Sequence, residues 1–103
     1  MAQKIISGVT IDVNEEGYFT KPEQWTQELA IEIAREERIQ LSKKHFAVLE
    51  LLRERFFKGE SLTIRMVGNS GIIDIKDFYG LFPGAPMKKA AKIAGIPKPS
   101  SCV

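Results

Sequence analysis

The sequence predicts an α+β fold that is mainly helical, with an N-terminal β-hairpin or meander packed on about five helices and an extended C-terminal arm. Three observations lead to this prediction. β-Branched residues in partial alternation are concentrated between residues 4 and 20. From residue 21 to residue 94, apolar residues recur at helical spacing between capping and stop signals. The last eight residues include two prolines and two serines, which favour neither helix nor strand.

The length and composition bound the organisation of the chain. A chain of 103 residues has the size of one compact domain, and we expect that domain over residues 1–95, followed by a flexible arm over residues 96–103. No apolar run is long enough to cross a bilayer, and the first twenty residues lack the pattern of a signal peptide. We therefore expect a cytoplasmic protein without membrane contact.

The N-terminal segment is expected to form strands and then a helix. Gly8 divides residues 4–13 into two strands, residues 14–17 supply a turn, and residues 18–20 add a third short strand. A helix is predicted over about 21–38, because Thr20 and Glu23 have capping-box spacing and Pro22 suits a first helical turn. One face of this helix carries the apolar residues Trp25, Leu29 and Ile33.

The clearest helix runs from Ser42, a favourable N-cap, to a stop at Gly59. Leu41 and Phe46 occupy the two positions of a hydrophobic staple. The apolar stripe of this helix consists of Phe46, Leu49, Leu52 and Phe56. His45, in the first turn, is interpreted as a structural histidine at a helix terminus rather than as a general base.

Three shorter helices are expected in the remaining part of the domain. One runs from Ser61 to about Val67, and a second follows the N-cap Asp74 and ends before residue 83. Pro86 then opens a final helix that continues through residue 94 and is closed by Gly95.

Charge is distributed unevenly along the chain. Residues 84–103 contain four lysines and no acid, whereas the first 83 residues contain 11 basic and 13 acidic side chains. The lysines of the C-terminal end are Lys88, Lys89, Lys92 and Lys98. Such an asymmetry favours encounters with acidic partners without specifying which.

Cys102 is the single cysteine, so the chain cannot form an internal disulfide, and a reducing compartment is the simplest interpretation. A cysteine near the end of a proline-rich arm is expected to be exposed, and nearby cations favour its reactive thiolate. Arg65 and Lys98 are the candidates for stabilising that thiolate, and Lys88, Lys89 and Lys92 are the candidates for docking a partner. With one Cys and one His, no metal site of soft ligands and no cofactor is expected.

Several segments resemble the DsrC/TusE family. The C-terminal residues 91–103, with the pattern Ala-Gly-x-Pro-Lys-Pro-x-x-Cys, are similar to the signature with which that family ends. The resemblance continues upstream over nearly the whole chain, at residues 81–83, 64–66, 41–45, 16–18 and 25.

The resemblance implies a β-meander on a helical array and a penultimate cysteine that carries sulfur as a persulfide. TusE-type members accept sulfur from a TusBCD-like donor and pass it toward the enzyme that thiolates transfer RNA. DsrC-type members act with dissimilatory sulfite reductase, as its gamma subunit, and use two cysteines. Ala91 stands where those members carry the second cysteine, which favours a one-thiol carrier, and the segment between Met66 and Leu81 is shorter than the family pattern.

Other classes of function remain open. The protein could be a thiol-based regulator or structural partner of a reductase. Residues 61–82 could form a helix–turn–helix, but the expected second helix offers Lys76 as its cation and begins with Asp74 and Asp77, which would repel phosphate, so direct nucleic-acid binding is not expected. The sequence contains no phosphate-binding glycine loop or nucleophile–base arrangement, so any enzymatic role is at most that of a sulfurtransferase forming one half of a relay.

Overall fold

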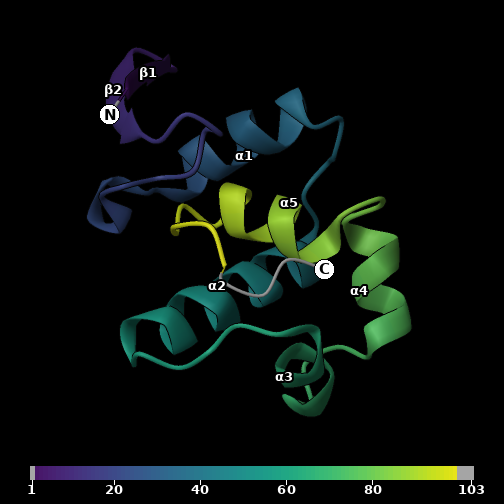
Figure 1. Ribbon diagram of the computed structural model, residues 1–103. Helices are drawn as coiled ribbons and strands as arrows, with labels where there is room; N and C mark the ends of the chain where they lie inside the picture. The colour runs from purple at the N-terminus through teal and green to yellow at the C-terminus, as the bar shows by residue number, and fades with distance from the viewer. Residues whose placement is uncertain (1, 100–103) are drawn as a thin grey trace.

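The computed structural model describes residues 2–99, so the predicted site at Cys102 lies outside the described residues. The mainly helical α+β prediction is confirmed. In chain order the elements are β1 (Ala2–Ile6), β2 (Val9–Val13), the 3₁₀ turn η1 (Pro22–Gln24), α1 (Gln27–Glu36), α2 (Lys43–Phe57), α3 (Ile64–Asn69), α4 (Ile75–Leu81) and α5 (Pro86–Ile93). Figure 1 shows the hairpin at one end of the molecule beside α1, with α3 and α4 at the other end.

The N-terminal hairpin forms as predicted. β1 and β2 pair antiparallel, with Ile6 opposite Val9, and the two residues between them, Ser7 and Gly8, have φ values of 50° and 80°. Positive φ at both positions is the requirement of the tight turn whose twist matches paired strands. The expected third strand is reduced to one bridge, between Val13 and Phe19.

The first helix begins later than predicted. Pro22 opens a 3₁₀ turn and not the helix, and Trp25, with ψ of 141°, is extended. Thr26 is the N-cap of α1, its hydroxyl accepting from the Leu29 N–H at 3.2 Å. The capping-box spacing of Thr20 and Glu23 was therefore misleading. Trp25 is extended because its indole N–H bonds to the Ile93 carbonyl, a contact that a continuous helix would not allow.

The other helices follow the predicted signals closely. The Ser42 side chain caps α2, and Gly59 follows its end with φ of 77°. α3 starts after the N-cap Thr63 and not at Ser61, because the threonine hydroxyl accepts from the Met66 N–H at 3.0 Å. Asp74 caps α4 as predicted, accepting from the Asp77 N–H at 2.7 Å.

α5 is the central helix of the molecule. It lies between α1 and α2 and also contacts α4 (Figure 1). The side chains of Ala90 and Ala91 are fully buried, as are those of Met87 and Ile93. Small residues allow neighbouring helices to approach closely, so the C-terminal arm begins from a helix that packs against three others.

Candidate functional site

The arm root, residues 93–99, begins with a helix stop of defined geometry. The Gly95 N–H donates to the Lys92 carbonyl and the Ile96 N–H donates to the Ala91 carbonyl, each at 3.2 Å. Gly95 has φ of 68°, and the side chain of Ile96 is fully buried. This is the hydrogen-bond pair of a Schellman motif, which fixes the direction in which the chain leaves α5.

Trp25 covers the end of α5. Its indole N–H donates to the Ile93 carbonyl at 2.8 Å, which satisfies one of the carbonyls that the helix leaves without a partner. A Cβ atom at Gly95 would lie 2.2 Å from Trp25 Cδ1. Glycine is therefore required here by contact as well as by backbone conformation.

After Trp25, Arg53 is the second residue that holds the arm root in place. From α2, its Nη1 donates to the Ala94 carbonyl at 2.9 Å and its Nη2 to the Pro22 carbonyl at 3.1 Å. The guanidinium carbon lies 4.4 Å from the centroid of the Trp25 ring. Burial lowers the pKa of Arg53 from its usual value, but an arginine so far above neutrality stays charged.

Arg53 is not among the site residues that the sequence predicts. The signal was present, since Arg53 stands four residues after Leu49, a fully buried core residue, and thus falls within the apolar side of α2. A cation on the apolar side of a helix indicates a partner in the interior.

The segment that carries Pro22 and Trp25 is attached to the hairpin. Gln24 accepts from the Asp12 N–H and donates to an Asp12 carboxylate oxygen, both at 2.9 Å. Hydrogen bonds from Gln24 and then Gln3, with the charge of Lys21, lower the pKa of Asp12. The hairpin therefore supports, through Gln24, the turn that holds the arm root.

Residues 96–99 lie against the body. Pro99 is buried, and Lys98 Nζ bonds to both carboxylate oxygens of Glu16 at 3.0 Å. Pro97, Lys98 and Pro99 line a shallow hollow together with the end of α2 and the loop that follows it, residues 56 and 59–62. The predicted boundary at residue 95 thus falls inside packed structure, because Ile96 belongs to the core.

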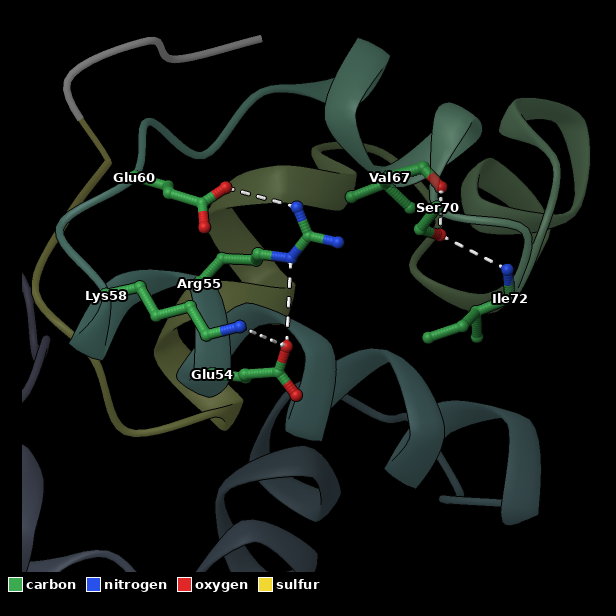
Figure 2. A network of polar contacts seen from close by, with 7 residues as sticks. All are labelled: Glu54, Arg55, Lys58, Glu60, Val67, Ser70 and Ile72. Atoms are coloured by element: carbon green, nitrogen blue, oxygen red, sulfur yellow. Dashed lines mark hydrogen bonds and ion pairs between the residues drawn. The ribbon is translucent and has the colours of Figure 1, made fainter.

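The loop between α2 and α3, which forms one wall of that hollow, is itself held in place. Figure 2 shows Arg55 between Glu54 and Glu60, with an Nη1–carboxylate distance of 3.1 Å to Glu60. Farther along, the Ser70 hydroxyl donates to the Val67 carbonyl at 2.6 Å and accepts from the Ile72 N–H at 3.2 Å (Figure 2). The Arg55 contact ties Glu60 of the loop to the end of α2, whereas the Ser70 bonds lie at the far end of α3.

The three predicted docking lysines are brought together on α5. Lys88, Lys89 and Lys92 line one hollow with Glu16 and Glu37. Lys89 Nζ donates to the Pro83 carbonyl at 2.7 Å and Lys92 Nζ lies 3.8 Å from a Glu37 oxygen, whereas Lys88 has no bond to another described residue. The expected basic surface is thus interleaved with acidic groups that reduce its field.

Arg65 is not brought near the described part of the arm by any contact. It is the second residue of α3, with an exposed side chain and no ion pair within residues 2–99. Its predicted meeting with the thiol involves residues 100–103, which are not described, and stays a prediction.

His45 is a structural histidine, as interpreted. Its Nδ1 accepts from the Ser42 N–H at 3.0 Å, so Nε2 carries the proton and donates to the Leu81 carbonyl at 2.9 Å. The ring is buried and packs edge-on against Phe82. It joins the start of α2 to the end of α4.

Residues 2–99 contain neither a metal-binding cluster nor a membrane-spanning helix. No group of three or more His, Cys, Asp or Glu side chains there could hold a metal ion. No helix in this range is long and apolar enough to span a bilayer.

Curated relatives match the chain over almost its full length. Sulfurtransferase TusE of Salmonella typhimurium is 38% identical and that of Escherichia coli 37%, each match covering 96% of this chain and 98% of the relative. The alignments run over 112 positions, more than the 103 residues present here, so the relatives contain residues without a counterpart in this chain. A segment that is shorter here than in the relatives, as expected between Met66 and Leu81, would give such an excess of aligned positions.

Solved structures match the fold as well as the sequence. The oxidised gamma subunit of dissimilatory sulfite reductase, DsrC, from Archaeoglobus fulgidus has a TM-score of 0.82 and 30% identity, over 99% of this chain and 100% of that one. Allochromatium vinosum DsrC has a TM-score of 0.82 and 28% identity, over 98% and 97%. A family model described as "DsrC like protein" matches residues 5–103. With its central helix, its clamped arm root and these matches, the chain belongs to the DsrC-like family.

Proposed function

We propose that this protein is a sulfur carrier that accepts persulfide sulfur on Cys102 and passes it to a partner. The relatives named sulfurtransferase TusE, whose matches cover 96% of this chain, support this proposal. The structure of the arm root also supports it, because Trp25 and Arg53 fix the point at which the arm leaves the folded domain. A carrier needs reach and a reactive thiol but no substrate pocket of its own.

The transfer step is a thiol exchange. The Cys102 thiolate attacks the outer sulfur of a persulfide on a donor protein, a new S–S bond forms, and the donor's S–S bond breaks. The bonding electron pair leaves with the donor sulfur, which is released as a thiolate. The number of disulfide-type bonds is unchanged, so the step needs no external oxidant or reductant.

Reach depends on how much of the arm is free of the body. Cys102 comes three residues after Pro99, so its Cα atom can lie no more than about 10 Å from the Cα atom of Pro99. The whole segment from residue 96 could span about 25 Å if it detached. We propose that partners engage the arm close to the body, with Lys88 as the exposed cation of the docking surface and Lys98 or Arg65 beside the thiolate.

A one-thiol carrier fits this chain better than a two-thiol mechanism. Cys102 is the single cysteine, and the position of the second cysteine in DsrC-type members is the fully buried Ala91. We therefore propose a TusE-like role in a cytoplasmic relay toward thiolated transfer RNA, with a TusBCD-like donor and a transfer-RNA-thiolating acceptor.

The test is the intact mass after incubation with a persulfide donor such as a cysteine desulfurase loaded with its substrate. Wild-type protein should gain about 32 Da, the mass of one sulfur, and lose it again on mild reduction. Cys102→Ser should gain nothing, while Ser101→Ala, altered at the neighbouring position, should label as wild type does. Equal labelling of Cys102→Ser and wild type would show that Cys102 is not the acceptor.

The second candidate is a gamma-subunit-like partner of dissimilatory sulfite reductase. The likeness to DsrC structures at a TM-score of 0.82 favours it. Saturable binding to such a reductase, combined with no mass gain from persulfide donors, would replace the carrier proposal by this one. A regulator without sulfur transfer would give neither result.

A further inference from the structure

A second hollow lies away from the arm root, between the end of α1 and the start of α2. It has a volume of about 540 Å³, and it shares no lining residue with the hollow that holds residues 97–99. Its lining includes Ile31, Arg35, Arg38, Ile39, Leu41 and Phe46. The carrier chemistry at Cys102 uses none of these residues.

Arg38 at the rim has an unusual backbone conformation. Its φ is 60°, and it occupies the left-handed position after α1, where the Ile39 N–H donates to the Ala34 carbonyl at 2.8 Å. The equivalent positions after α2 and α5 are Gly59 and Gly95. Glycine adopts this conformation without steric strain and any other residue does not. An arginine at this position accepts some backbone strain and places its side chain at the rim of the hollow.

The charges around the hollow leave that side chain available. Arg35 is already paired with Glu32, with an N–O distance of 3.2 Å. Arg38 is exposed and makes no ion pair or side-chain hydrogen bond with any residue in the range 2–99. The site therefore presents one guanidinium without an ion-pair partner among the described residues, that of Arg38. A guanidinium group can bind a carboxylate in bidentate geometry.

Apolar side chains lie beside the guanidinium. Ile31 is 41% exposed, a large fraction for an isoleucine on a helix that packs on the core. Ile39, Leu41 and Phe46 are partly buried, so each keeps part of its apolar surface in contact with solvent at the hollow. Covering such surface is favourable, and the partner that covers it must bring apolar side chains of its own.

We propose that this hollow binds a short segment of a partner protein that carries a carboxylate next to apolar side chains. The carboxylate bonds to Arg38, and the apolar side chains contact Ile31 and Leu41. A nucleic acid does not fit, because one free cation between apolar walls offers little to a phosphate backbone. The proposal does not rest on the sulfur-carrier function, since it involves no thiol.

The test measures binding of two synthetic helical peptides by fluorescence anisotropy. One carries glutamates beside leucines, and its twin carries glutamines in place of the glutamates. We expect the wild-type protein to prefer the acidic peptide by about tenfold or more. Amide shifts on titration should be confined to residues 31–46. Cys102→Ser should bind both peptides as wild type does, which separates this proposal from the carrier proposal.

Arg38→Gly separates binding from folding. It should raise the Tm by a few °C, because glycine relieves the backbone strain, and abolish the preference for the acidic peptide. Arg38→Lys should keep part of the preference for the acidic peptide. Ile31→Gln should lower the affinity for both peptides. Lys76→Gln, which removes an equal charge from α4, should leave both affinities unchanged.

Three results would overturn the proposal. The first is equal affinity for the two peptides, or undiminished binding by Arg38→Gly. The second is a set of shifted amides elsewhere in the chain. The third is a wild-type dimer in sedimentation that Arg38→Gly dissociates, because a second copy of the chain would then be the occupant.

Discussion

The Cα of Gly95 faces the indole of Trp25 so closely that no side chain fits between them. The contact exists because Trp25 is extended, which places its indole N–H on the Ile93 carbonyl at the end of α5. Arg53 lies over the same ring, with its guanidinium carbon 4.4 Å from the ring centroid, and bonds the next carbonyl. At the scale of single residues, the start of the arm is defined by one glycine and two donors to helix carbonyls that would otherwise have no partner.

Gly95→Ala should lower the free energy of unfolding by about 3 kcal/mol, because a Cβ overlaps Trp25 and the residue must also keep a positive φ. The matched control is Gly59→Ala, which has φ of 77° but open space around the Cβ position. It should cost about 1 kcal/mol, the conformational part alone. Urea unfolding of both variants measures the difference, and equal losses would mean that the Trp25 contact has no energetic weight.

At the scale of elements, the arm root is held by three parts of the chain that are distant in sequence. The η1 segment supplies Trp25, α2 supplies Arg53, and the turn after β2 supplies Glu16. The last of these contacts is of a different kind from the other two. The side chains of Lys98 and Glu16 are 35% and 55% exposed, so water and salt screen their attraction.

Glu16→Gln should therefore loosen residues 97–99 without unfolding the domain. We expect the stability to change by less than about 1 kcal/mol, while the backbone ¹⁵N order parameter of Lys98 falls. Glu15→Gln is the control, since Glu15 is exposed and makes no ion pair within the described residues. The same loosening should appear in wild-type protein at high salt. If the two variants gave identical order parameters at Lys98, the ion pair would not restrain the arm.

At the scale of the whole molecule, α5 is both the centre of the core and the base of the arm. Helices α1, α2 and α4 all contact it, and the buried part of the chain continues past its end to Ile96. The arm therefore leaves the domain from a helix that three other helices hold in place. This arrangement suits a carrier, because the point from which the arm extends is fixed.

A pair of truncations tests where the folded body ends. A chain ending at Pro99 serves as the reference, and a chain ending at Gly95 should be less stable than that reference by about 3 kcal/mol. The main parts of the loss are the burial of Ile96, worth about 2 kcal/mol, and the bond from its N–H to the Ala91 carbonyl, worth about 1 kcal/mol. Denaturant unfolding compares the two. Equal stability would place the boundary at residue 95, where the sequence predicts it.

Local signals predicted most of the elements. Ser42, Asp74 and Pro86 begin helices where expected, and Gly59 and Gly95 follow helix ends, because caps and stops act through neighbouring backbone groups. The start of α1 was wrong, because Thr20 and Thr26 both satisfy the local requirement for a cap. The choice between them depends on Trp25, whose partner Ile93 is far along the chain.

The sequence by itself determined the fold class, most of the helix boundaries, the lone thiol at Cys102 and the likeness to a family of sulfur carriers. Tertiary structure alone decided that Arg53 and Trp25 clamp the arm root, that Glu16 holds Lys98, and that the body extends through Ile96. The physical reason is the range of the interactions. Capping bonds join residues three or four positions apart, so the local sequence predicts them. Each clamp joins residues tens of positions apart, which become neighbours only when α5 packs into the core.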